Sequence, residues 1–302
     1  MAVEKGFGPN QSLTATYVGS HGTRLLREDV FSNTPTASPT VFVTHNGDWS
    51  NYNALQMQFQ RRMSRGLQLL ASYAWAHALD TGSLDNCGCT TTNMIHSVNP
   101  ALDYASSSFD IRNAASLAFA YQIPWKKSDR LSSTLLGNWG VFGIWSASSP
   151  QPYSVYAHDS SPEFGPYTTR ADLVPGVPLH IPSSTQPNGR LLNPAAFAKP
   201  SAGQYGDSPR NGFRSYPIDQ LDFALSKRIQ VNDRVSLDFR AEYFNVLNHP
   251  MFAPPWATFQ NYISAPNVVR TSETLNEAYG GLSPLYAVGG PRSGQLSLKL
   301  QF

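Results

Sequence analysis

The sequence predicts an all-β fold, namely a segment of an antiparallel transmembrane β-barrel (a partial barrel) with about eight strands, short periplasmic turns and long extracellular loops. Apolar and polar residues alternate in one run after another, as they do in strands that present two different faces. The connections between these runs alternate between short and long along the chain. The 302 residues include 12% aromatic but only 14% charged residues, a composition that favours strands and loops over a disordered chain or a coiled coil.

The clearest strands form a predicted hairpin around a turn at residues 62–66. Before the turn, residues 55–60 alternate leucine, methionine and phenylalanine with three glutamines. After the turn, residues 67–75 place leucines, an alanine, Tyr73 and Trp75 on one face. Two alternating runs joined by a short segment that ends in glycine are typical of a β-hairpin.

Further runs with the same alternation complete the predicted set of eight. Each is roughly ten residues long, which suits a tilted strand that crosses a bilayer. The facing of one run, near residues 138–149, stays open because large apolar residues occur on both of its parities. These runs lie near residues 12–20, 110–123, 138–149, 219–229, 234–246 and 295–302.

The connections indicate how the strands cross the membrane. Outer-membrane barrels have short periplasmic turns and long extracellular loops, whereas a soluble β-sandwich, the alternative here, rarely carries long loops without structure of their own. With the short turns in the periplasm, the first strand runs toward the cell surface, the last ends in the periplasm, and the strand number is even. The short connections lie at 63–66 and 232–234, the medium one at 126–137, and the long ones near 21–50, 80–108, 150–217 and 248–291.

The alternation also assigns side chains to faces. Arg61 and Lys227 share the apolar parity, but both fall at predicted periplasmic strand ends, where a long basic side chain can snorkel. Tyr73 and Trp75 are expected in the outer aromatic girdle, and Tyr121 and Trp125 in the inner one. The candidates for lumen-facing residues are Gln56, Gln58, Gln60, Asp222, Asp238, Arg240, Glu242 and Lys299.

Asp238, Arg240 and Glu242 alternate on one predicted strand face. We expect a hydrogen-bonded ladder of lumenal side chains there, in company with Asp222. A substrate rail or an acid–base pair of carboxylates is the alternative.

No catalytic, nucleotide-binding or metal-binding motif with a diagnostic spacing occurs in the sequence. A formal net charge of +2 predicts no strong attraction to nucleic acid. Cys87 and Cys89 are too close together for a framework disulfide and are expected to be a loop disulfide or two loop thiols. The seven histidines are expected in loops, apart from His77 at a strand end. We therefore expect neither a cofactor nor a metal site.

Several segments resemble the barrel of Oar-like TonB-dependent outer-membrane transporters of the acidobacterial type. The last strand, with Leu296, Leu298, Leu300 and Phe302, also resembles the C-terminal insertion signal of outer-membrane barrels. The resemblance covers essentially the whole chain. The segments that carry it are 50–56, 60–67, 71–75, 109–113, 193–197, 239–250 and 295–302.

This resemblance implies a role in energised uptake of a bulky nutrient across the outer membrane, without enzymatic chemistry. Barrels of this class have 22 strands. Residues 1–302 are therefore expected to be a single C-terminal barrel portion, with the plug domain and the signal peptide absent. The implied partners are outer-membrane lipid, the barrel-assembly machinery through the C-terminal strand, TonB only through the absent plug, and an unknown solute.

Two other functions stay open. A stand-alone eight-stranded barrel would have an interior filled by side chains and would serve as a structural protein or an adhesin. An outer-membrane or secreted hydrolase would use Asp238 and Glu242 as a carboxylate pair, although no motif supports it.

Overall fold

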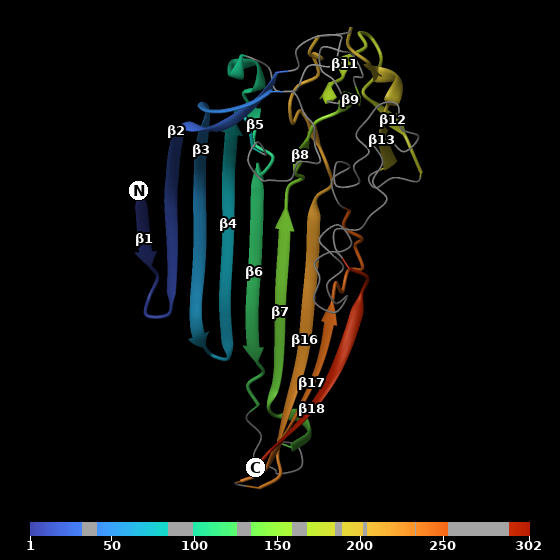
Figure 1. Cartoon of the computed structure of the whole chain (residues 1–302). Coiled ribbons are helices and arrows are strands. Elements are labelled where there is room, and N and C mark those ends of the chain that lie inside the picture. The colour runs from blue at the N-terminus through green and yellow to red at the C-terminus, as the bar shows by residue number, and fades with distance from the viewer. Residues whose placement is uncertain are drawn as a thin grey trace.

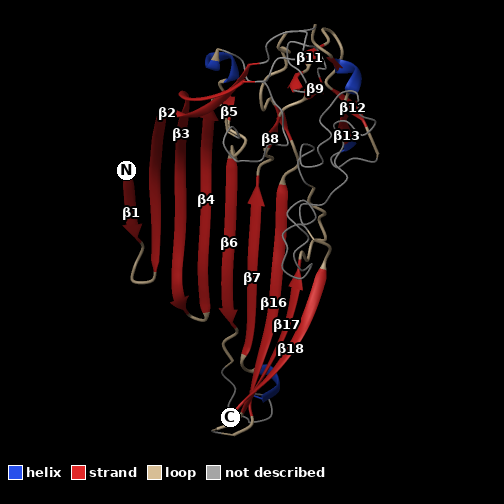
Figure 2. Ribbon diagram, in the orientation of Figure 1, coloured by secondary structure: helices blue, strands red, loops and turns tan. Residues whose placement is uncertain are grey.

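A computed structural model of the chain describes residues 1–31, 41–83, 99–125, 134–158, 168–184, 189–201, 204–232, 234–252 and 290–302. Within these residues the dominant element is one large sheet of long antiparallel strands (Figure 1). The short helical turns lie beyond the strand ends (Figure 2). No helix among the described residues is both long enough and apolar enough to cross a membrane.

Nine strands follow one another across the main sheet in chain order, and each is antiparallel to its neighbours. A two-residue strand, β5 (Ala105–Ser106), pairs with the end of β4. The nine are β1 (Ala2–Gly6), β2 (Gln11–Phe31), β3 (Val41–Ser64), β4 (Leu67–Asp80), β6 (Asn113–Gln122), β7 (Trp139–Ser148), β16 (Ile218–Gln230), β17 (Ser236–Phe244) and β18 (Ser293–Gln301).

All eight predicted strands are present, but two expectations about the N-terminal region are wrong. The stretch predicted as a long loop near residues 21–50 belongs largely to β2 and β3, which pair as far as Phe31 and Val41. Register shifts between Gly22 and Arg27 interrupt the alternation there, which hid the continuation of the strand. In addition, β1 precedes the first predicted strand, so the path through the described sheet has nine strands rather than an even number, and its first strand runs toward the short-turn end. With five residues, β1 is too short to show a clear period.

The short turns lie at one end of the sheet, and the described parts of the long connections that follow β4 and β7 lie at the other, as predicted (Figure 1). Arg65 and Gly66 form the two-residue turn between β3 and β4, and both have positive φ, as a tight hairpin turn requires. A side chain at position 66 would also lie 2.2 Å from the Gln122 carbonyl oxygen. The C-terminus lies at the short-turn end.

The strand register gives the sheet two chemically distinct faces. Phe59, for example, is opposite Leu13 on one side and Ala71 on the other, and that row continues through Leu117, Trp145 and Leu221. We call this the apolar face, and the opposite face, which carries Gln58, the polar face. The register also settles β7, since Val141 and Trp145 lie on the apolar face opposite Leu225 and Leu221.

The apolar side chains of the apolar face are half-buried or exposed, whereas the buried core lies elsewhere. Leu296, Leu298 and Leu300 on β18 expose 70%, 67% and 56% of their surface. A soluble sandwich would bury such a face against a second sheet. Instead, the contiguous cluster of buried apolar residues belongs to the connection between β7 and β16, with Val155, Ala171, Leu192, Phe197 and Phe213 among its members.

This connection, the described part of residues 149–217, folds into a small unit at the long-loop end, which we call the loop cap (Figure 1). Four short antiparallel pairs and a 3-10 turn build it. Asn193 starts the turn, because its side chain accepts a hydrogen bond from the Ala195 amide. The elements are β8 (Pro152–Tyr153) with β15 (Phe213–Arg214), β9 (Tyr156–His158) with β10 (Thr168–Arg170), β11 (Asp172–Leu173) with β14 (Phe197–Ala198), β12 (His180–Pro182) with β13 (Arg190–Leu192), and η3 (Pro194–Ala196).

Candidate functional site

The eight residues predicted to face a lumen all lie on the polar face. They form two groups that β4, β6 and β7 separate. Gln56, Gln58 and Gln60 lie on β3, in the half of the sheet built by β2, β3, β4 and β6. We call it the uncharged half because the middle of its polar face, within residues 12–20, 50–60, 68–78 and 113–122, carries no charged side chain. The charged half, built by β16, β17 and β18, carries the others, namely Asp222, Asp238, Arg240, Glu242 and Lys299.

In the charged half, ionic side chains bond to one another along and across the strands. Arg240 Nε donates to Glu242 Oε1 at 2.6 Å, and the Gln295 amide donates to the other oxygen of Glu242. Arg228 Nε lies 3.4 Å from Asp238 Oδ1. The expected ladder is therefore present within β16–β18, and it leaves Asp238 and Glu242 held in ion pairs rather than presented as a catalytic carboxylate pair.

Asp222 stands apart from this ladder. Its Oδ1 accepts hydrogen bonds from the Gln220 amide at 2.9 Å and from the Asn245 backbone N–H at 2.9 Å. The carboxylate of β16 thus holds the chain where it leaves β17.

In the uncharged half, the polar face contains a shallow hollow of about 420 Å³. Ser72 and Ser116 meet there through hydroxyl oxygens 2.7 Å apart. The hollow is lined by Thr14, Thr16, Gln56, Met57, Gln58, Ser72, Tyr73, Ala74, Ala114, Ala115 and Ser116.

The predicted girdle residues lie at two levels along the strands. Tyr73 and Trp75 lie near the middle of β4, level with the start of β6, where the Tyr73 hydroxyl donates to Asn113 at 2.7 Å. Tyr121 is opposite Leu67 at the short-turn end, and Trp125 follows the end of β6. The two pairs are thus separated along the strands, and their role as two aromatic girdles stays a prediction.

Two basic residues on the apolar parity reach the short-turn end. Lys227 Nζ donates to the Gly137 carbonyl in the connection before β7 and lies 5.3 Å from the centre of the Trp139 ring. Arg61 donates to the Ser64 carbonyl at 3.4 Å. Both charges therefore turn toward a strand end, as expected for basic side chains that snorkel.

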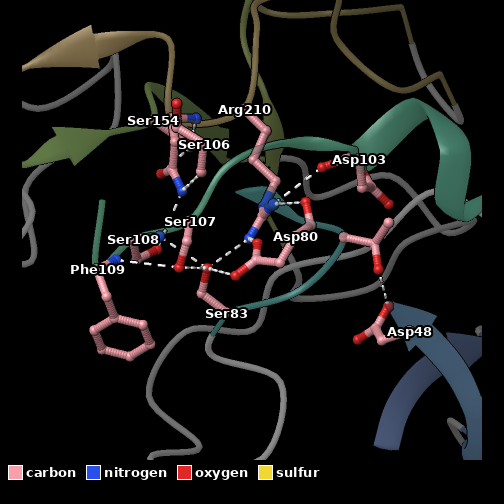
Figure 3. A network of polar contacts seen from close by, with 12 residues as sticks. Asp48, Asp80, Ser83, Asp103, Ser106, Ser107, Ser108, Phe109, Ser154 and Arg210 are labelled. Carbon is pink, nitrogen blue, oxygen red and sulfur yellow. Dashed lines mark hydrogen bonds and ion pairs between the residues drawn. The ribbon is translucent and has the colours of Figure 1, made fainter. Parts of the chain in front are cut away.

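A buried polar network attaches the loop cap to the sheet (Figure 3). One nitrogen of Arg210 donates to the backbone carbonyl oxygens of Asp80 at 2.9 Å and of Asp103 at 3.0 Å. Its other terminal nitrogen donates to the Asp80 carboxylate at 2.7 Å and to the Ser83 hydroxyl at 2.9 Å. A single cap residue thus joins the end of β4 to the 3-10 turn η1 (Pro100–Asp103).

Asp103 is the centre of this network. It is fully buried, and its two carboxylate oxygens accept from Arg170 of the cap at 2.6 Å and from Arg27 of β2 at 3.1 Å. Arg27, also fully buried, donates in turn to Asp48 of β3 at 3.0 Å. The chain of contacts therefore runs from the extended β2–β3 pair through η1 to the cap.

Asp110 forms a second attachment. It accepts from the Ala78 backbone N–H at 2.9 Å, from Arg112 at 2.8 Å and from Arg214 of the cap at 2.7 Å. Burial by itself would raise the pKa of Asp110, but the Ala78 hydrogen bond and the two guanidinium groups hold that pKa below its ordinary value. Asp110 is therefore a charged anchor under ordinary conditions.

Sequence reasoning missed this network. The segment 109–113, which supplies Asp110 and Arg112, stood out through the resemblance and as the start of the strand predicted near residues 110–123, neither of which indicates a buried network. The cap arginines lie 67 to 130 positions from the aspartates that they bind. Nothing in the alternation marks such pairs, because a charged residue in a long connection looks the same whether it is solvated or buried.

The described histidines form no candidate site. Cys87, Cys89 and His96 lie outside the described residues. His21 and His45 lie in β2 and β3, which corrects their expected place in a loop. Among the residues that the structure describes, no group of histidine, cysteine and acidic side chains could hold a metal ion.

Comparisons with known proteins agree with this geometry. The sequence model for a family described as "Outer membrane beta barrel domain" matches residues 1–276. The fold is similar to the crystal structure of the outer membrane transporter YddB from Escherichia coli, with a TM-score of 0.51 and 10% sequence identity. The likeness covers 99% of this chain but 31% of the YddB chain. No curated protein matches the sequence.

Proposed function

The chain belongs to the outer membrane beta barrel domain family and lies in the outer membrane, and from this premise we propose that it forms part of the wall of a TonB-dependent, Oar-like transporter. The transporter would take up a bulky nutrient, with the polar face lining its path. The observation that carries this proposal is the fold shared with an outer membrane transporter over 99% of this chain and 31% of the other.

Strand direction favours a wall segment over a small barrel that closes by itself. β1 and β18 form the two edges of the described sheet, and because the path contains nine strands, they run in the same direction. Direct closure would pair them in parallel, whereas single-chain bacterial outer-membrane barrels are antiparallel with an even strand number. Antiparallel closure needs an odd number of further strands between these edges, since unpaired backbone groups cannot face lipid.

The proposed partners follow from the faces of the sheet. Outer-membrane lipid would contact the apolar face. The barrel-assembly machinery would bind β18, which carries the alternating Leu296, Leu298 and Leu300 before Phe302. TonB would act through a plug domain and not through the residues of this chain. The loop cap, at the extracellular end, would take part in capturing the solute.

The experiment is to isolate the outer-membrane protein that contains this chain and to measure its heat-modifiable gel mobility and its retention of the TonB periplasmic domain. We expect a folded species of altered mobility that retains TonB. A water-soluble protein without heat-modifiable mobility would contradict the barrel. A folded barrel that does not retain TonB would contradict the TonB-dependent type alone.

A further inference from the structure

We propose that the hollow in the uncharged half of the polar face is a binding surface for an uncharged, hydroxyl-rich solute of the oligosaccharide class. This inference rests on the proposed function, since it requires the polar face to line a solute path. Three observations carry it: the chemistry of the lining, the free hydrogen-bonding groups, and the balance of charge on the rest of that face.

The lining of the hollow is polar but uncharged. Its side chains supply hydroxyls from Thr14, Thr16, Ser72 and Ser116 and amides from Gln56 and Gln58, and none of the lining residues is charged. A volume of about 420 Å³ falls in the size range of small-molecule sites. Glu4 lies opposite Thr14 on the edge strand β1, outside this lining.

The glutamines of the two halves differ in their hydrogen bonding. In the charged half, the side chains of Gln220, Gln295 and Gln301 are bonded to Asp222, Glu242 and Arg228, respectively. The amides of Gln56 and Gln58 have no side-chain partner among the described residues. Each free amide offers two donors and an acceptor, and a sugar hydroxyl both donates and accepts. Such a surface complements hydroxyl groups better than it complements an ion.

The charges of the charged half balance one another, so they favour neither an anion nor a cation at the hollow. Its three carboxylates, from Asp222, Asp238 and Glu242, are matched in number by the basic groups of Arg228, Arg240 and Lys299. Most of these charges are already held in pairs. The Arg240 guanidinium also lies 5.0 Å from the centre of the Phe142 ring, on the side toward the hollow's half of the sheet. A charged solute would therefore meet no counter-charge in the lining of the hollow, whereas it would lose hydration there.

The test compares three oligomers of similar length on the folded protein in detergent: neutral maltohexaose, acidic hexagalacturonate and basic chitosan hexamer. Titration calorimetry is expected to show binding of maltohexaose that does not change between about 50 and about 500 mM salt, because no ion pair is involved. Tighter binding of either charged oligomer would overturn the inference.

Two matched variants locate the site. Gln58→Glu places an unpaired carboxylate in the hollow and is expected to weaken maltohexaose binding about tenfold, since it replaces a donor with a hydrated acceptor. Gln68→Glu makes the same change on the polar face of β4, outside the lining, and is expected to leave binding unchanged. Equal effects of the two variants would overturn the assignment to the hollow.

Heat-modifiable mobility of each sample separates this inference from the proposed function. A protein that keeps the folded mobility but binds no maltohexaose at up to about 10 mM, a concentration at which even very weak sites fill, overturns the inference and leaves the barrel in place. Loss of the folded mobility in the unmodified protein would instead count against the proposed function.

Discussion

The Arg210 guanidinium donates to the backbone carbonyl oxygen of Asp80 at 2.9 Å and to the Asp80 carboxylate at 2.7 Å, although the two residues are 130 positions apart in the sequence. Asp80 is the last residue of β4, where the strand leaves the sheet. The contact therefore fixes the loop cap on the rim of the wall. An arginine suits this position because its planar fork reaches a carbonyl and a carboxylate together.

Replacing Arg210 is expected to release the cap without unfolding the sheet. Arg210→Ala leaves the buried Asp80 carboxylate without its counter-charge, which costs about 3–5 kcal/mol at a buried pair. Hydrogen–deuterium exchange should rise across residues 204–217 and 99–106, while β3 and β16 stay protected. Arg228→Ala, at the exposed pair with Asp238, serves as the control and should change stability by less than about 1 kcal/mol. Equal exchange in both variants would show that Arg210 does not hold the loop cap on the sheet.

Acid is expected to loosen the second attachment. The pKa of Asp110 lies below its ordinary value of 3.8, so the folded protein binds the Asp110 proton less readily than the unfolded chain does. This contribution to stability is present above the ordinary pKa and is lost as the pH falls through the lower, folded pKa. Exchange of cap amides around Arg214, corrected for its intrinsic pH dependence, should therefore increase below about pH 4.

An Asp110→Asn variant distinguishes this anchor from general acid unfolding. The amide cannot carry the charge that Arg112 and Arg214 bind, so the exchange of the same amides should already be raised at neutral pH. It should then show a smaller acid-induced increase than the unmodified protein. An identical pH profile in the two proteins would argue against Asp110 as the titrating anchor.

Local periodicity predicted the sheet but could not predict the cap. The alternation from Leu55 to Trp75 reports which face each side chain occupies, because neighbouring positions in a strand point to opposite sides. It failed where a bulge near Gly22 broke the period and where β1 was too short to show one. The contact between Asp103 and Arg170 depends on how two distant connections fold against each other, which no local pattern records.

On the polar face, likewise, the sequence predicts which side of the sheet a residue faces but not which hydrogen bonds it makes. The sequence placed Gln58 and Glu242 on a common face, and the register agrees. Whether each group is free or bonded depends on the neighbours that pairing brings, such as Gln295 beside Glu242. The parity of a residue is thus a local property, whereas the state of its hydrogen bonds is set by the sheet.

A charged side chain in the middle of the apolar face is expected to lower the stability of the folded protein strongly only if that face contacts lipid. Phe59 lies between the levels of Tyr73 and Tyr121, in the row with Ala71 and Leu117. Phe59→Arg should lower the free energy of unfolding in lipid vesicles by about 2–4 kcal/mol, as for arginine at the bilayer midplane. Gln60→Arg, one residue further on the polar face, should cost much less. Denaturant titration followed by tryptophan fluorescence measures both, and similar losses would contradict a lipid-facing apolar side.

The last strand offers a test of assembly rather than of stability. β18 ends the sheet with Leu296, Leu298 and Leu300 on the apolar face, and Phe302 follows it with 95% of its surface exposed. If the barrel-assembly machinery binds this strand through its terminal aromatic residue, Phe302→Ala should lower the heat-modifiable outer-membrane fraction severalfold in cells. The same variant should still fold in detergent, where no machinery is needed.

Ser297→Ala, on the polar face of the same strand, is the matched control and should assemble normally. A Phe302 variant that assembles as well as the control would show that the assembly machinery does not recognise the terminal aromatic residue. An equal loss of the folded fraction in detergent would show that Phe302 acts through stability.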